Sequence, residues 1–210
     1  VSRESYSTYL TAFAKGEYDI LLGTQMVAKG LNFPNVTLVG VLGADGAMYS
    51  EDFRSYERMF SLLTQVVGRA GRGKSFGRAI IQTVNPENNV IELAKKQDYD
   101  TFYNGEILSR KLLTFPPYCD ICTVTVQSVD RNDAVNTING IFCKIKEMLN
   151  GEYKDIKLII LGPAPTAVAK VNNRYRYRMI IKCRNNKNFR NMLKTAIDIN
   201  FFFIISFTLI

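Results

Sequence analysis

The chain has 210 residues, of which 47% are hydrophobic, which suffices for one large domain or two small ones and argues against a disordered chain. Its formal net charge of +8 favours an anionic partner such as nucleic acid. It has no histidine, which excludes histidine-based general base chemistry and removes the commonest zinc ligand.

The first 42 residues predict a helix followed by two buried strands. A short amphipathic helix ends at Gly16, residues 19–22 form the first strand, and the valine-rich segment 36–42 forms the second. The loop after the first strand carries Thr24, Gln25 and Lys29, whose polar groups suit a nucleic-acid backbone or a nucleotide. An ordinary loop explains these three residues equally well.

A second helix is predicted over residues 53–67, capped by Ser50 and with Glu51 and Asp52 in its first turn. It leads into a glycine-flanked turn that holds two arginines, and a strand over residues 78–84 follows. Two arginine forks on a short turn suit a polyphosphate, and a solvated basic turn is the alternative. The alternation of strands and helices predicts a parallel sheet.

The same turn contains a pattern that resembles a phosphate-binding P-loop, made of Gly68, Gly73, Lys74 and Ser75. A P-loop needs a strand before it and a helix after it, so that backbone N–H groups face the phosphates. The predicted order here is helix, turn and strand, so we reject the P-loop interpretation.

Residues 85–118 predict two helices and a boundary. Asn85 caps a helix that Pro86 opens and that runs to Gln97, and a further helix covers residues 98–113. The segment Phe-Pro-Pro-Tyr at 115–118 ends that helix.

The remaining chain predicts the order β-α-β-β-α-β, which is a ferredoxin-like arrangement. The predicted elements are strand 119–129, helix 132–149, strand 157–161, strand 175–183, helix 189–199 and the apolar end 201–210. That end is too short to cross a bilayer, so we interpret it as an edge strand or as the product of a reading-frame error.

Cations and tyrosines alternate around the third of these strands, where Lys170, Arg174, Arg176 and Arg178 are interspersed with Tyr175 and Tyr177. Alternation on a strand predicts charge on one face and rings on the other. Such a strand suits nucleic acid, through phosphate pairing and base stacking. A solvated strand face over tyrosines packed in the core is the alternative.

The four cysteines are Cys119, Cys122, Cys143 and Cys183. Cys119 and Cys122 form a C-x-x-C, but they lie in a predicted strand where positions three apart point to opposite faces. We therefore expect reduced, mostly buried thiols of a cytosolic protein and no metal site.

Several of these stretches together resemble one family. Residues 23–34 resemble motif V of superfamily 2 helicases, and residues 65–73 resemble motif VI. More specific are stretches similar to the primosomal protein N′ (PriA) family of replication-restart helicases, at residues 52–58, 82–87, 115–118, 161–165 and 174–178. The similarity covers about residues 6–199.

The resemblance implies roles for individual residues. Arg72 aligns with the arginine finger of the family, Arg69 with its partner on the nucleotide phosphates, and Gln65 lies at the same cleft. It also implies nucleotide contacts at Gly68, Gly71 and Asn32, although the family often has aspartate where Asn32 stands, and DNA contacts at Thr24, Gln25 and Lys29. The alternating pattern of cations and tyrosines adds Lys170, Arg174, Tyr175, Arg176 and Arg178 as DNA-binding candidates.

The resemblance further implies a bacterial, cytoplasmic and nucleoid-associated 3′ to 5′ DNA helicase that hydrolyses ATP with Mg²⁺. Its partners would be forked and single-stranded DNA, primosome proteins, single-stranded DNA-binding protein and the replicative helicase loader, with no membrane partner. The family's P-loop, acidic Mg²⁺ motif and zinc-binding cysteines precede this region. We therefore expect ATP and Mg²⁺ to be bound mainly outside this chain, zinc to be absent from it, and the isolated chain to be inactive.

The predicted fold is α/β, with a partial RecA-like parallel sheet of the second helicase lobe followed by a small ferredoxin-like α+β domain. The predicted limits are 1–97 for the lobe, 98–118 for a linker helix and 119–210 for the C-terminal DNA- or partner-binding domain. A non-catalytic DNA-binding module or remnant derived from such a helicase is the alternative function. A helicase of another superfamily 2 branch is a further alternative, but it would account only for motifs V and VI and not for the Pro-rich and Arg-Tyr stretches.

Overall fold

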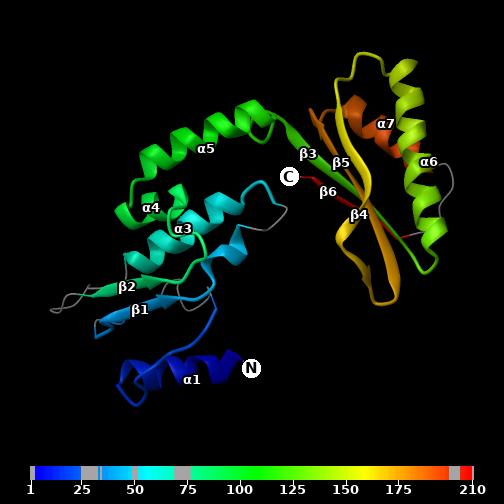
Figure 1. Ribbon diagram of the computed structural model, residues 1–210. Coiled ribbons are helices and arrows are strands. Elements are labelled where there is room, and N and C mark those ends of the chain that lie inside the picture. The colour runs from blue at the N-terminus through cyan, green and yellow to red at the C-terminus, as the bar shows by residue number, and fades with distance from the viewer. Residues whose placement is uncertain are drawn as a thin grey trace. The chain divides into compact units, whose positions relative to one another are not determined.

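A computed structural model describes residues 3–24, 33, 35–48, 52–68, 77–198 and 204–209, and for 3–6, 47, 198 and 204–209 it describes the backbone only. The chain divides into two compact units, Val1–Glu106 and Ile107–Ile210 (Figure 1). The division falls inside one helix, and the predicted limits at residues 97 and 118 stay predictions.

The N-terminal unit contains a parallel pair of strands, as predicted. Strands β1 and β2 pair from Leu38 with Arg78 to Val41 with Ile81. The elements in chain order are α1 (Arg3–Ala14), β1 (Leu38–Val41), η1 (Ala44–Ala47), α3 (Ser55–Val67), β2 (Arg78–Ile81), α4 (Asn89–Lys96) and α5 (Tyr99–Leu113), which continues into the second unit.

The core of this unit lies on one face of the strand pair. Met59, Phe60 and Leu63 of α3 are buried there, because apolar residues recur on one face of that helix. Phe60 stacks on Phe102 of α5 with ring centroids 4.1 Å apart and planes 7° apart. Alternation along β2 leaves Ile80 on the opposite face, and its side chain is exposed.

The predicted strand over residues 19–22 is wrong. The segment is not a strand, and its side chains Ile20 and Leu22 are 85% and 83% exposed. An apolar run becomes a buried strand only when neighbouring strands supply hydrogen bonds and a second layer covers it. Within the described part of the chain, only β2 pairs with β1.

Two predicted helix caps are also wrong. Helix α3 begins at Ser55 and not near Ser50, and Asp52 lies before it, where its carboxylate accepts the backbone N–H of Arg54 at 3.0 Å. Helix α4 is capped by Asn88, whose Oδ1 accepts the backbone N–H of Val90 at 2.9 Å, and not by Asn85. Both predictions placed the cap too early because several polar residues precede each helix.

The C-terminal unit has the predicted β-α-β-β-α-β order. Its four strands form an antiparallel sheet in the order β4-β5-β3-β6, which is the ferredoxin-like arrangement. The apolar end is an edge strand paired with β3, as predicted. The elements are β3 (Asp120–Ser128), α6 (Arg131–Asn150), β4 (Ile159–Val171), β5 (Arg174–Cys183), α7 (Lys187–Asp198) and β6 (Ile204–Leu209).

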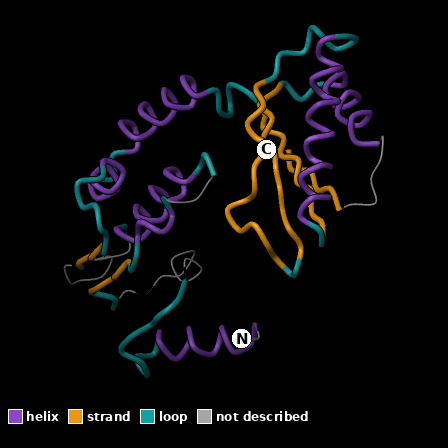
Figure 2. Tube along the Cα trace, turned by 45° about the vertical axis from the view of Figure 1, so that its right-hand side comes forward, coloured by secondary structure: helices purple, strands orange, loops and turns teal. Residues whose placement is uncertain are grey.

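Helices α6 and α7 cover the same face of this sheet (Figure 2). Between them and the strands lies a core whose members are almost all fully buried, including Val124, Ile138, Ile141, Met179 and Phe189. Every second residue of β3 and β5 points into this core, so the residues between them belong to the opposite face.

Strand β4 is longer than predicted, because the segment after Leu161 stays paired with β5 through two register shifts. Gly162 makes the first irregularity possible: its φ is +92°, and a Cβ there would lie 3.0 Å from the carbonyl oxygen of Arg178. Asn172 and Asn173, with φ of 50° and 59°, close the hairpin. Residues 162–178 are therefore a β-hairpin and not a loose connection.

Candidate functional site

The nucleotide-side candidates lie at and beyond the end of α3. The side chain of Gln65 is exposed on the last turn of that helix, and Gly68 ends it with its N–H donating to the Thr64 carbonyl at 2.9 Å. A Cβ at Gly68 would lie only 3.1 Å from that carbonyl oxygen. Glycine therefore lets the backbone pass close to the Thr64 carbonyl where the helix ends. Arg69, Gly71 and Arg72 lie outside the described residues.

Of the four candidates in the motif V stretch, only Thr24 is described, and its side chain is exposed in an irregular segment. Gln25, Lys29 and Asn32 lie outside the described residues. The DNA contact of Thr24 therefore stays a prediction.

A polar cluster joins the carboxyl ends of β1 and β2. The Asp45 carboxylate accepts the Thr83 hydroxyl at 2.6 Å and the backbone N–H of Val84 at 2.9 Å, and Gln82 accepts the Gly43 N–H at 3.3 Å. The hydrogen bond from Thr83 and that from Val84 outweigh burial and lower the pKa of Asp45.

This cluster ties together the two loops at the sheet edge where parallel sheets usually bind ligands. Sequence reasoning did not include Asp45 or Thr83 among the candidates. The available signal was their position, since Asp45 follows the predicted strand 36–42 by three residues and Thr83 lies near the end of the predicted strand 78–84.

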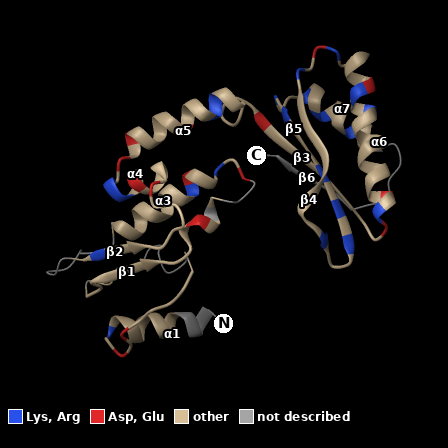
Figure 3. Cartoon of the chain, viewed as in Figure 1, with Lys and Arg blue, Asp and Glu red and all other residues tan. Residues whose placement is uncertain are grey.

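In the C-terminal unit, the arginines predicted to bind DNA share one face of β5. Arg174, Arg176 and Arg178 lie at alternate positions and are all half-buried, on the face opposite α6 and α7. Figure 3 shows Lys and Arg along the β4 and β5 hairpin. The predicted separation of arginines from tyrosines is therefore confirmed.

The prediction that Lys170 shares the arginine face is wrong. The register shifts in β4 place Lys170 opposite Tyr175, and its ammonium lies 4.7 Å from the centre of that ring. The bulge changes the alternation by which a strand assigns its faces. On the same side, Arg131 of α6 donates from Nε to the Tyr177 hydroxyl at 3.2 Å.

Arg131 was missed by sequence reasoning because it lies 46 residues from Tyr177 and contacts it only through the fold.

Two cations of β5 are in unusual environments. Nε of Arg176 is buried without a hydrogen-bond partner in the described part of the chain, an arrangement that costs about 1–3 kcal/mol or more for a charged group. Lys182 is also buried, but its ammonium donates to the Leu113 carbonyl at the end of α5 and lies 3.9 Å from the Phe115 ring centre. Lys182 therefore fastens the Phe-Pro-Pro-Tyr turn to the sheet, whereas Arg176 has an unused donor.

The cysteines follow the sequence prediction in part. Cys122 and Cys183 are buried, Cys119 is half-buried, and Cys143 is exposed, contrary to expectation. Burial raises the pKa of Cys122 to about 11 and that of Cys183 to about 12. In the described ranges, no three acidic or thiol side chains group as metal ligands would.

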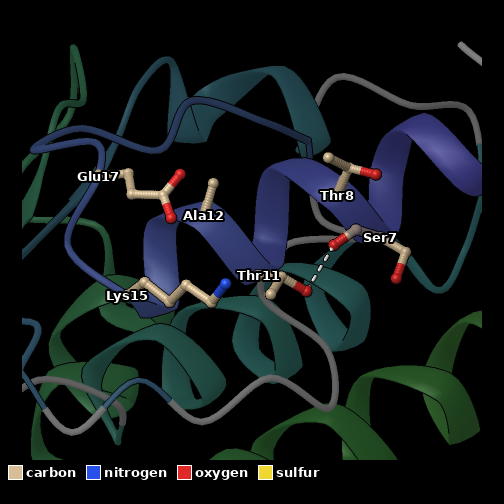
Figure 4. A pocket seen from close by; sticks show the side chains of 6 residues that line it. All are labelled: Ser7, Thr8, Thr11, Ala12, Lys15 and Glu17. Atoms are coloured by element: carbon tan, nitrogen blue, oxygen red, sulfur yellow. Dashed lines mark hydrogen bonds between the residues drawn. The ribbon is translucent and has the colours of Figure 1, made fainter.

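A surface hollow lies along α1, lined by Ser7, Thr8, Thr11, Ala12, Lys15 and Glu17 (Figure 4). The Thr11 hydroxyl donates to the Ser7 carbonyl at 3.0 Å, so it is occupied within the helix. No predicted site residue lines this hollow. Every helix in the described ranges is too short or too polar to cross a bilayer.

Two family models match the chain, one for each part. Residues 2–74 match the helicase conserved C-terminal domain, which defines the first unit as part of a helicase lobe. Residues 111–199 match the primosomal protein N C-terminal domain.

The relatives are proteins named replication restart protein PriA. That of Bacillus subtilis is 43% identical over 194 residues, which is 92% of this chain and 24% of the relative. Those of Synechocystis and Chlamydia trachomatis are 38% and 36% identical, over 85% and 92% of this chain and 21% and 26% of the relatives. The chain belongs to the PriA family and corresponds to its C-terminal region. It spans about a quarter of the length of these relatives.

Proposed function

We propose that the chain is the C-terminal part of an ATP-dependent 3′ to 5′ DNA helicase that restarts stalled replication forks and assembles the primosome. One observation carries the proposal: a helicase C-terminal match and a primosomal protein N C-terminal match follow each other in a single chain. Relatives that match both parts are named replication restart proteins.

In this proposal Arg72 is the arginine finger, Arg69 binds the nucleotide phosphates, and Gly68 and Gly71 let the backbone approach them. The exposed Gln65 amide on the last turn of α3 fits a role beside the nucleotide. Bound ATP would supply the phosphoryl group whose transfer drives movement along DNA. An arginine finger contributes roughly 10³ to 10⁵ in rate, because it neutralises charge that develops during phosphoryl transfer.

The remaining assignments are proposals of the same kind. ATP and Mg²⁺ would be bound mainly by the N-terminal part of the full-length protein, which would also carry the zinc. Thr24, Gln25, Lys29 and the β5 arginines would contact single-stranded or forked DNA. Primosome proteins, single-stranded DNA-binding protein and the replicative helicase loader would be partners in the bacterial cytoplasm, near the nucleoid.

The test is Arg72→Ala in the full-length protein, with Arg78→Ala as the matched control. Arg78 is an exposed arginine at the start of β2, so the control removes the same charge six residues further along. We expect Arg72→Ala to reduce DNA-stimulated ATP hydrolysis by roughly 10³ or more while fork binding persists, and Arg78→Ala to leave both unchanged.

Unwinding that survives Arg72→Ala would contradict the arginine-finger role of Arg72. An unsubstituted full-length protein that binds forks but neither hydrolyses ATP nor unwinds DNA would favour the second candidate, a non-catalytic DNA-binding module. One observation speaks for that candidate: the C-terminal unit has a four-stranded sheet and a core of its own.

A further inference from the structure

We infer that the arginine face of β5, made of Arg174, Arg176 and Arg178, binds a DNA strand through its phosphates alone, with the bases directed away from the protein. The inference rests on the proposed function in taking DNA as the ligand. It differs from the sequence prediction, which combined phosphate pairing with base stacking on tyrosine.

The tyrosines of β5 are not available to bases on this face. Tyr175 points to the opposite face, where the Lys170 ammonium lies 4.7 Å from its ring centre. Tyr177 packs against the core of the C-terminal unit, and its hydroxyl accepts a hydrogen bond from Arg131. Base stacking needs an open ring face, and both rings are occupied by contacts within the protein.

The arginine face itself offers hydrogen-bond donors and no rings along β3 and β5. Register places Thr125 of β3 opposite Arg178, and Gln127 opposite Arg176. Phe115 lies at the far end of β5, where the Lys182 ammonium already lies against its ring. The surface between these residues therefore suits anionic oxygen atoms and not the flat face of a base.

The geometry of the arginines fits a regularly charged chain. Alternate residues of a strand are about 6.8 Å apart, which is comparable to the separation of successive phosphates along a nucleic-acid strand. Each guanidinium can bind a phosphate with two parallel hydrogen bonds. Arg176, at the centre, has a buried Nε with no hydrogen-bond partner in the described part of the chain, so no described protein acceptor holds its guanidinium through this atom.

The opposite face supplies a matched control. Arg131 and Lys146 of α6 also carry two positive charges, but both are engaged with aromatic residues, Arg131 with the Tyr177 hydroxyl and Lys146 with the Phe142 ring. Removing those two charges changes the net charge by the same amount as removing Arg174 and Arg176. If the charges act only through a general electrostatic effect, both double variants lose affinity for DNA. If the arginine face binds phosphates, only the Arg174 and Arg176 variant loses affinity.

The experiment measures binding of the full-length protein to oligo-dT and to an abasic strand of equal length, at several salt concentrations. We expect Arg174→Ala with Arg176→Ala to weaken binding by roughly tenfold and to lower the salt slope by about 1.4, for two phosphates of a single strand. The loss should be equal on the two strands. Arg131→Ala with Lys146→Ala should leave both affinity and slope unchanged.

Three outcomes would overturn the inference. A loss seen on oligo-dT but absent on the abasic strand would mean that the site reads bases. An equal loss from the Arg131 and Lys146 pair would mean that the arginine face is not the site. If neither double variant loses affinity, the proposal that β5 binds DNA is wrong. The helicase assignment would not be affected, because it is tested separately at Arg72.

Urea unfolding of each variant and the single change Arg176→Lys keep the experiment interpretable if the alanine variants are unstable. Arg176→Lys retains the charge, so it should retain most of the salt slope, which a purely structural role of the guanidinium would not predict.

Discussion

Both units contain apolar segments, but these segments are buried in the C-terminal unit and partly exposed in the N-terminal unit. In the C-terminal unit, four strands pair and two helices close one face, so that residues such as Val124 and Ile138 are fully buried. In the N-terminal unit, two described strands pair, and apolar side chains such as Ile20 remain exposed. A hydrophobic run is therefore not sufficient for a buried strand, because pairing partners and a covering layer decide its fate.

The largest expected effect is in the C-terminal core. Phe189→Ala removes a fully buried ring and should lower the free energy of unfolding of that unit by about 3–5 kcal/mol. The measurement is urea unfolding at pH 8, monitored by thiol modification in a background with Cys119→Ser and Cys143→Ser, because these two thiols are half-buried and exposed. Cys122 and Cys183 have raised pKa values of about 11 and 12, so they stay protonated and unreactive until the unit unfolds.

The variant Met59→Ala, which leaves a cavity in the core of the N-terminal unit, tests whether the two units unfold independently. If the two units are independent, this change leaves the midpoint of thiol modification where it was. A midpoint that moves as far as it does for Phe189→Ala would mean that the two cores unfold together.

A medium effect is expected at the start of the C-terminal unit. Lys182→Met keeps the apolar stem but removes the ammonium that bonds the Leu113 carbonyl, and should cost about 2 kcal/mol. Lys144→Met is the control, because Lys144 pairs with Glu147 on the surface of α6 and such pairs contribute little. Equal losses from the two substitutions would contradict a special role of Lys182.

A smaller, pH-dependent effect is expected in the N-terminal unit. The Thr83 hydroxyl is the main cause of the lowered pKa of Asp45, so its stabilisation is present above the ordinary value of 3.8 and fades as pH falls through the lower folded value. Thr83→Val should therefore lower the urea midpoint more at pH 6 than at pH 3, as followed by circular dichroism. A difference that is the same at both pH values would contradict this role of the carboxylate.

The smallest effect is expected at Ile20, which is 85% exposed. Ile20→Ser should change the free energy of unfolding by less than about 0.5 kcal/mol, because no packing is lost. Circular dichroism during urea unfolding measures this, with the buried Leu63→Ala as the positive control. A loss of more than about 1 kcal/mol on Ile20→Ser would mean that the segment is buried in solution, and would remove the contrast between the units.

Much of the C-terminal unit could be predicted from its sequence, because its helices and strands have clear periods of 3.6 and 2 and strong boundaries. The six elements were placed within a few residues, apart from the end of β4, where Gly162 and Pro163 hid the continued pairing with β5. The candidate site was predicted less completely. The arginines of β5 were found by alternation, whereas the contact between Arg131 and Tyr177 joins residues 46 positions apart and has no local signal.

By itself, the sequence determined the family, the α/β class, the parallel strand pair and the ferredoxin-like order, since these depend on motifs and on the periodicity of apolar residues within short windows. Only the tertiary structure decided which apolar runs are buried, on which side of the hairpin Lys170 lies, and that Lys182 meets the end of α5. The physical reason is that burial, register and charge contacts depend on neighbours far away in the chain, and a bulge or an unpaired edge changes them without changing the local pattern.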